Sequence, residues 1–144
     1  MFGKITTFTK EITKKGYLIT IVMTPFDVHY QKAPIDGVVT KVKYSKGTFR
    51  NAVFGAESMN ATLENEKNEI TIKGKIKLKV IQIAGAVARR IVCFVKPEDK
   101  IKKGQNIGLI KLGSQVCLIV PEIKLMIKEN QKMRAGETII GEMK

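Results

Sequence analysis

Ile70-Thr-Ile-Lys-Gly-Lys-Ile-Lys-Leu-Lys-Val-Ile-Gln-Ile83 is the stretch of this sequence that decides the fold most clearly. Its lysines, Lys73, Lys75, Lys77 and Lys79, alternate with apolar residues or glycine. Because successive side chains of a β-strand point to opposite faces, this period of two predicts a pair of half-buried strands with one basic face. Such lysines often protect a sheet edge from aggregation, or they contact acidic lipid headgroups. The residues leave both interpretations open.

The rest of the chain consists of further short strand signals. Tyr17–Met23 and Val116–Val120 are apolar and rich in β-branched residues, the pattern of strands buried on both faces. A turn at Pro34–Gly37 leads into an alternating strand. Other strand signals lie at Ile107–Ile110, Ile123–Ile127 and Thr138–Ile140, and Lys100–Gly104 and Lys132–Gly136 are similar basic turns. We therefore predict one all-β domain over residues 1–144, a sandwich or barrel, with a short helix or irregular loop around 49–63.

Composition narrows the classes of partner. The net charge of +13 indicates an anionic binding partner. Composition alone does not distinguish nucleic acid, acidic lipid and a phosphorylated substrate. Tryptophan is absent and aromatic residues are few, so stacking platforms for single-stranded nucleic acid are not evident. No apolar run approaches the ~18–20 residues of a membrane span, and Met1–Lys15 lacks the apolar segment of a signal peptide. We expect a cytoplasmic or peripheral protein.

Cysteine and histidine usage gives little sign of a metal site. Cys93 and Cys117 both lie in apolar runs, which predicts two buried thiols instead of a bridge or a ligand pair. The chain contains one histidine and no Cys-x-x-Cys pattern. We expect no bound metal.

Gly113-Ser114 is the first candidate for chemistry. A serine hydroxyl can attack the carbonyl before it and turn the amide into an ester, and elimination followed by hydrolysis then leaves a pyruvoyl group on the new N-terminus. Glycine before the break tolerates the backbone geometry that this attack needs. A Gly-Ser pair by itself is also ordinary turn chemistry.

Two further candidates follow apolar strands. His29 lies two residues after Asp27, so in an extended segment the aspartate could orient it, although a surface turn capped by Asp27 is the more ordinary structure for these residues. Arg89 and Arg90 interrupt an apolar run. Guanidinium groups there suit bidentate capture of a carboxylate or phosphate, or a structural salt bridge.

The ordered set of motifs resembles the phosphatidylserine decarboxylase family, in particular its short, archaetidylserine decarboxylase-like forms. The motifs that carry the resemblance run from about Ile19 to Ile140: Met23-Thr-Pro-Phe-Asp-Val-His29, Ala33-Pro-Ile-Asp-Gly-Val-Val39, Glu64-Asn-Glu-Lys-Asn68, Gln82-Ile-Ala-Gly85, Ala88-Arg-Arg-Ile-Val92, Leu112-Gly-Ser114 and Ala135-Gly-Glu-Thr138.

The resemblance implies a proenzyme that cuts itself between Gly113 and Ser114 and carries a pyruvoyl cofactor made from Ser114. That carbonyl would accept electrons when carbon dioxide leaves a serine phospholipid and an ethanolamine phospholipid forms. His29 is the candidate proton donor, and Arg89 or Arg90 would hold the substrate phosphate or carboxylate. Expected partners are the phospholipid, an anionic membrane surface on the cytoplasmic side, the two fragments as a heterodimer and a second copy of the chain, and not nucleic acid.

The sequence also departs from the family pattern. The upstream Pro-Ala-Asp-Gly motif, whose aspartate helps to activate the serine, and the hydrophobic N-terminal anchor are not found, so we expect a truncated or minimal form. Lys32 stands where longer forms have a second histidine. Asp36 follows His29 in the chain, so the activating role is not assigned to it. One alternative is an unprocessed, non-catalytic lipoyl-like or lipid-binding module, since the predicted fold also resembles the biotinyl/lipoyl-like hybrid. Another is a basic β-barrel that binds nucleic acid.

Overall fold

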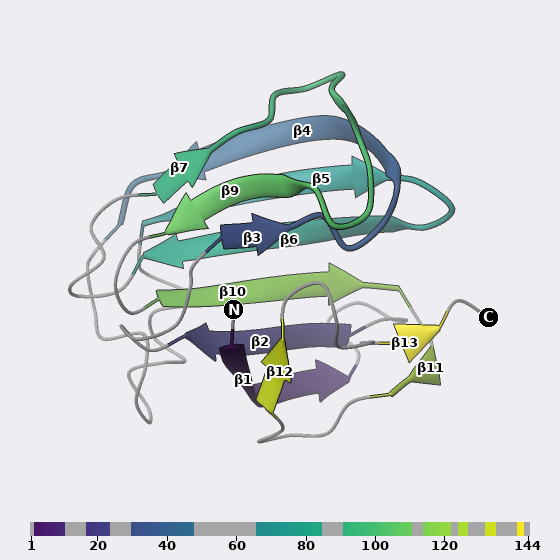
Figure 1. The fold of residues 1–144 in the computed structure, drawn as a ribbon. Coiled ribbons are helices and arrows are strands. Elements are labelled where there is room, and N and C mark those ends of the chain that lie inside the picture. Colours follow the sequence, from purple (N-terminus) through teal and green to yellow (C-terminus); the bar gives the residue numbers. More distant parts are fainter. Residues whose placement is uncertain are drawn as a thin grey trace.

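The structure, a computed structural model, describes residues 2–10, 17–23, 30–47, 66–84, 91–110, 114–121, 124–126, 132–134 and 141–142. Each regular element in these ranges is a β-strand (Figure 1). The strands are β1 (Phe2–Lys10), β2 (Tyr17–Met23), β3 (Tyr30–Lys32), β4 (Gly37–Ser45), β5 (Lys67–Lys73), β6 (Lys77–Ala84), β7 (Ile91–Cys93), β8 (Lys100–Ile101), β9 (Asn106–Ile110), β10 (Ser114–Val120), β11 (Lys124–Leu125), β12 (Lys132–Arg134) and β13 (Gly141–Glu142). The predicted all-β class is confirmed. The described residues contain no helix that is long and apolar enough to cross a membrane.

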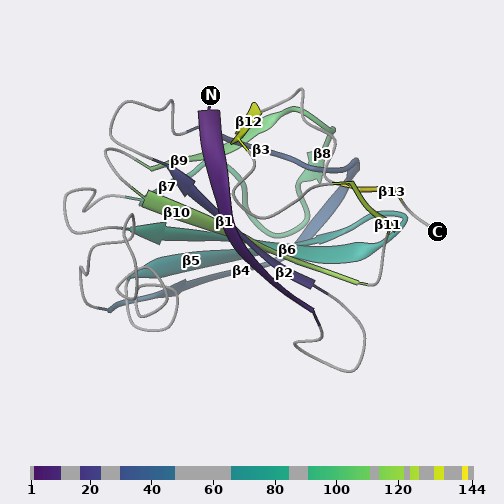
Figure 2. The same ribbon diagram turned by 90° about the horizontal axis from the view of Figure 1, so that it is seen from below.

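The strands form one large and two small antiparallel sheets. The large sheet has eight strands in the order β12-β1-β2-β10-β6-β5-β4-β8, a second sheet has the order β3-β9-β7, and β11 pairs with β13. In both views the β3-β9-β7 sheet lies over β4, β5 and β6 (Figures 1 and 2). The fold is therefore a sandwich in which the small sheet covers part of one face of the large sheet.

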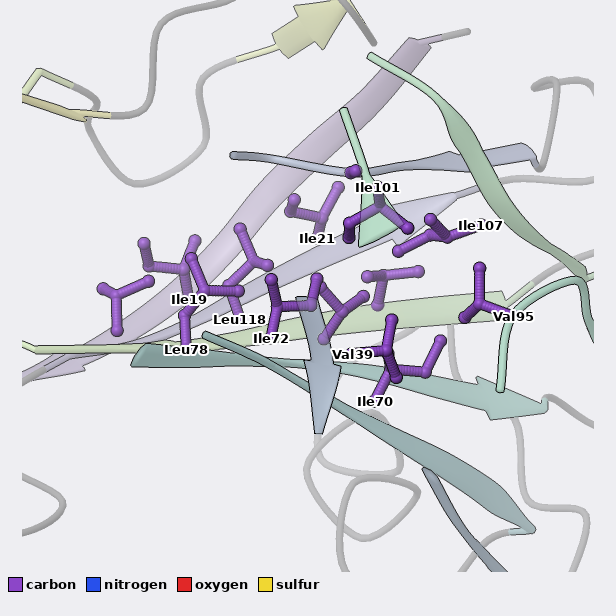
Figure 3. Packing of buried hydrophobic residues seen from close by; sticks show 14 of the residues in the cluster. Ile19, Ile21, Val39, Ile70, Ile72, Leu78, Val95, Ile101, Ile107 and Leu118 are labelled. Carbon is purple, nitrogen blue, oxygen red and sulfur yellow. The ribbon is translucent and has the colours of Figure 1, made fainter. Parts of the chain in front are cut away.

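The main core lies between these two sheets. Along β5 and β6 the two-residue alternation sends Ile70, Ile72, Leu78 and Val80 to this side, where each is at most 3% exposed. Ile107 and Ile110 of β9 belong to the same apolar cluster, and Figure 3 shows members of the cluster meeting from several strands. Burial of these branched side chains is the main force holding the sheets together. A smaller cluster of Ile81, Ile83 and Cys117 lies on the other face of the large sheet.

A small cluster of buried polar side chains lies within this apolar core, centred on Gln82. Gln82 is completely buried, and it points from β6 toward the small sheet. Its Oε1 accepts a hydrogen bond from Asn68 Nδ2 at 3.0 Å, and its Nε2 donates to Gln31 Oε1 at 2.8 Å and to the carbonyl oxygen of Val92 at 3.2 Å. The amide therefore connects two strands of the large sheet, β5 and β6, to two strands of the small sheet, β3 and β7. We call these four residues the Gln82 network.

Most strand predictions are confirmed, and the hairpin predicted at Ile70–Ile83 is formed by β5 and β6. The basic turn predicted at Lys132–Gly136 is wrong in part, because Lys132–Arg134 is a strand that pairs with Phe2–Lys4 of β1. Because β1 and β12 lie near opposite ends of the chain, no local sequence pattern indicates that they pair. The strand expected at Ile123–Ile127 is reduced to Lys124–Leu125 and lies in the separate β11-β13 sheet. The helix or loop expected at 49–63, and Thr138–Ile140, lie outside the described residues.

Gly108 of β9 has no room for a side chain. A Cβ there would collide with Gln82 Nε2 and would lie 2.9 Å from the carbonyl oxygen of Val92. Gly108→Ala should therefore lower the free energy of unfolding by about 1–3 kcal/mol, measured by urea denaturation. As a control, Gly104 has a φ of +86° and nothing within 4 Å of the place that a Cβ would take, and Asn tolerates that conformation. Gly104→Asn should change stability by no more than about 0.5 kcal/mol. Equal stability of Gly108→Ala and the wild type would contradict this packing.

Candidate active site

Ser114 is the first residue of β10, a central strand of the large sheet. It lies directly opposite Met23 on one side and Ala84 on the other. Met23 and Ala84 are the last residues of β2 and β6. Position 114 is therefore fixed by two neighbouring strands at the point where both of them end.

The small sheet brings further strand ends to the same end of the sandwich. β3 begins at Tyr30, which pairs with Leu109, and β7 begins at Ile91, which pairs with Ile110. Ile110 is the last residue of β9, and the chain continues from it to Ser114. In both ribbon views the ends of β2, β6 and β9 and the start of β10 lie at the left of the molecule (Figures 1 and 2).

Each sequence-predicted site residue adjoins one of these strand ends along the chain. His29 immediately precedes β3, Arg89 and Arg90 immediately precede β7, and Gly113 immediately precedes β10. All four lie outside the described residues, and of Ser114 the structure describes the backbone. Thus the topology brings together the strand ends that adjoin every predicted residue, although those residues are far apart in sequence.

The Gln82 network is the part of this site that the sequence analysis missed. Gln82 is two residues before Ala84, Gln31 is two residues after His29, and Val92 is two residues after Arg90. The network therefore joins three of the strands that adjoin the predicted site, close to their ends. A signal for it exists, since Gln82 is polar at an inward position of the alternation that contains Leu78 and Val80.

The start of β5 is held at the same end. The backbone N–H of Ala84 donates to the carbonyl oxygen of Glu66 at 3.0 Å, and Lys67 pairs with both Ser45 and Ile83. Partial desolvation raises the pKa of the Tyr44 phenol above its ordinary 10.0, and so do the hydrogen bond to Glu66 and the charge of that carboxylate. Tyr44 and Glu66 therefore interact beside the start of β5.

The two thiols differ in burial. Cys117, three residues after Ser114 in β10, is buried as predicted, and its Sγ lies 3.5 Å from Thr20 Oγ1. Cys93 is only half-buried, so the prediction for it was wrong, and its Sγ donates to the carbonyl oxygen of Val95 at 3.2 Å. It ends β7 at the rim of the small sheet, where packing covers one side of the residue. Neither Cys93 nor Cys117 forms a disulfide in the part of the chain that the structure describes.

The family model described as phosphatidylserine decarboxylase matches residues 1–141. The chain belongs to the phosphatidylserine decarboxylase family. No solved structure matches it.

Curated relatives in the phosphatidylserine decarboxylase family extend beyond the matched region. The phosphatidylserine decarboxylase proenzyme of Chlorobium limicola is 41% identical over 126 residues, which are 86% of this chain and 58% of that protein. The proposed archaetidylserine decarboxylase proenzyme of Methanothermobacter thermautotrophicus is 42% identical over 128 residues, covering 88% of this chain and 55% of that protein. The chain thus spans somewhat more than half the length of these relatives.

A double-mutant cycle can test whether the Gln82 network couples the two sheets of this phosphatidylserine decarboxylase family member. Gln82→Leu should lower the free energy of unfolding by about 2–4 kcal/mol, because Asn68 and Val92 each lose a buried hydrogen-bond partner. In a double-mutant cycle by urea denaturation, Gln82→Leu and Gln31→Leu should show an interaction energy of about 1–3 kcal/mol.

The control cycle uses Lys32→Ala and Asn106→Ala, whose exposed side chains form a 2.9 Å hydrogen bond between the neighbouring strands β3 and β9. Its interaction energy should stay below about 0.5 kcal/mol. Additive effects of the two glutamine substitutions would mean that the amide contact does not join the sheets energetically.

Proposed function

We propose that this chain is a self-processing, pyruvoyl-dependent decarboxylase of serine phospholipids, cut between Gly113 and Ser114. The observation that supports this most is the position of Ser114. It opens a central strand at the end of the sandwich, among strand ends that adjoin His29, Arg89 and Arg90 along the chain. The curated relatives are named as decarboxylase proenzymes, which is consistent with processing.

Cleavage would begin when the Ser114 hydroxyl attacks the Gly113 carbonyl carbon and the peptide nitrogen takes up a proton. The resulting ester joins Gly113 to the side-chain oxygen of residue 114. Loss of the α-proton of residue 114 and departure of the Gly113 carboxylate break the chain and leave a dehydroalanine. Water then replaces its nitrogen, which leaves as ammonia, and residue 114 becomes a pyruvoyl group.

The strands around Ser114 suit a break at that point. β9 ends at Ile110 in the small sheet and β10 starts at Ser114 in the large sheet, so the cut would fall between two separately paired strands. Residues 114–120 would keep their pairing with β2 and those up to 119 with β6. The fragments 1–113 and 114–144 would therefore stay together as a heterodimer.

The pyruvoyl group at residue 114 would supply a carbonyl with which the substrate amine can react. It would also accept the electron pair that remains when the bond to carbon dioxide breaks. His29 would deliver the proton that replaces carbon dioxide, since histidine is the residue type whose ordinary pKa lies nearest working pH. Arg89 or Arg90 would hold the substrate phosphate or carboxylate by paired hydrogen bonds. The substrate would be phosphatidylserine or an archaeal-type serine phospholipid, reached from the cytoplasmic side of the membrane.

Intact-mass measurement of the freshly expressed chain tests the processing step. The wild type should give two masses that correspond to residues 1–113 and to residues 114–144 with a pyruvoyl N-terminus. Ser114→Ala removes the attacking oxygen and should give one uncut mass, whereas the control Ser45→Ala in β4 should be cut like the wild type. A single uncut mass for the wild type would contradict self-processing and favour the non-catalytic, lipoyl-like alternative.

Turnover tests the role of His29 separately. His29→Gln keeps a hydrogen-bonding side chain but cannot deliver a proton, so release of carbon dioxide from detergent-dispersed phosphatidylserine should fall by about 10²–10⁴-fold. The measurement uses variant protein whose cleavage has been verified by mass. If cleaved His29→Gln turned over the substrate as fast as the wild type, His29 would not be the proton donor.

A further inference from the structure

Six lysines gather on the outer face of the large sheet, opposite the side that packs on the small sheet. They come from three adjacent strands: Lys41 and Lys43 from β4, Lys67 and Lys73 from β5, and Lys77 and Lys79 from β6. Each alternates with inward-facing residues such as Ile70, Ile72 and Leu78. We call this surface the lysine face. The sequence showed only one hairpin of it, because the contribution of β4 depends on strand pairing.

Edge protection does not account for most of these lysines. β5 is paired along its length with β4 and β6, and β6 is paired with β5 and β10. Lys67, Lys73, Lys77 and Lys79 therefore lie on interior strands. Among the three strands only β4 has an open edge, because β8 pairs with no more of it than Gly37 and Val38 in the described part of the chain.

The charge on this face is nearly all of one sign. Lys73 lies directly opposite Lys77, and like charges in such a pair are unfavourable for the sheet. Glu69 is the acidic residue that the described strands place among them. With Lys41, Lys43, Lys79 and Thr71 it lines a shallow hollow of about 100 Å³. A face that only had to be soluble could mix charges, so this arrangement suits an anionic surface.

The lysine face reaches the end of the sandwich that carries Ser114. Lys67 lies opposite Ile83, the residue before Ala84, and Ala84 lies opposite Ser114. At the other end the face extends to Lys73 and Lys77, beside the hairpin turn. Because Ile81 and Ile83 on this outer face are buried toward the Ser114 end, an anionic surface would contact the part of the face that carries Lys41, Lys43, Lys73 and Lys77.

We propose that the lysine face binds the anionic surface of a phospholipid bilayer, an inference that rests on the proposed phospholipid substrate. Lys41, Lys43, Lys73 and Lys77 are exposed, and among the described residues of β4, β5 and β6 the one large apolar side chain exposed on this face is Val38, opposite Lys73. Attraction would therefore be electrostatic and would weaken as salt screens it. It would hold the protein beside its substrate.

The test compares two triple variants with equal net charge. Lys73→Gln/Lys77→Gln/Lys79→Gln removes half of the lysine face, and Lys96→Gln/Lys102→Gln/Lys103→Gln removes three exposed lysines that are not paired with β4, β5 or β6. Each lowers the formal net charge of +13 by three. Sedimentation with phosphatidylcholine vesicles, with and without phosphatidylglycerol, measures binding at low and at physiological salt.

The first triple variant should bind the anionic vesicles about 100-fold more weakly than the wild type, and the second less than about 10-fold more weakly. Equal losses in the two variants would overturn the proposal, because net charge alone would explain them. Unchanged vesicle binding by the first variant would also overturn it. Loss of double-stranded DNA retention without loss of vesicle binding would assign the face to nucleic acid instead.

Cleavage and turnover on detergent-dispersed phosphatidylserine separate this proposal from the proposed function. Both should be unchanged in the first triple variant, since none of its three residues belongs to the candidate site. If the wild type is neither cut nor active, the proposed function fails whatever the vesicles show. If it is cut and active but the lysine face does not affect vesicle binding, only the present proposal fails.

Discussion

The buried amide of Gln82 is the contact on which the arrangement of the two sheets depends. Apolar packing between sheets has little direction, and it would tolerate small shifts of β3, β9 and β7 over the large sheet. The hydrogen bonds of Gln82 to Asn68, Gln31 and Val92 have defined lengths and angles, and they sit in a core from which water is excluded. A shift of the small sheet would leave buried polar groups without partners, which is costly.

Gly108 completes that constraint from the third strand. Its missing side chain lets β9 pass directly over the Gln82 amide, so the central strand of the small sheet lies close to β6. Because β9 leads to Ser114 along the chain, the same close approach sets where the chain leaves the small sheet. Gly108 and Gln82 together therefore determine how closely the two sheets pack and where β9 ends before the candidate cleavage point.

Local patterns predicted the strands well, because alternation and apolar runs record which face of each strand is buried. The β5-β6 hairpin, β2 and β10 were found in this way, as were the candidates Ser114 and His29 with the help of family motifs. What local patterns could not supply is pairing between distant segments. The strand β12, the lysine face across three strands and the partners of Gln82 all depend on which strands lie side by side.

The order of strands in the large sheet decides how the chain would refold if it is cut as proposed. β10 lies between β2 and β6, so it is an interior strand that belongs to the C-terminal side of the proposed cut. Before cleavage, folding of the chain is unimolecular. After cleavage, β10 would belong to the fragment 114–144, which must bind the fragment 1–113 for the sheet to re-form. Refolding would therefore become second order and depend on protein concentration. The processed protein would then be held together by its native pairing, and once unfolded at high dilution it would not readily re-form.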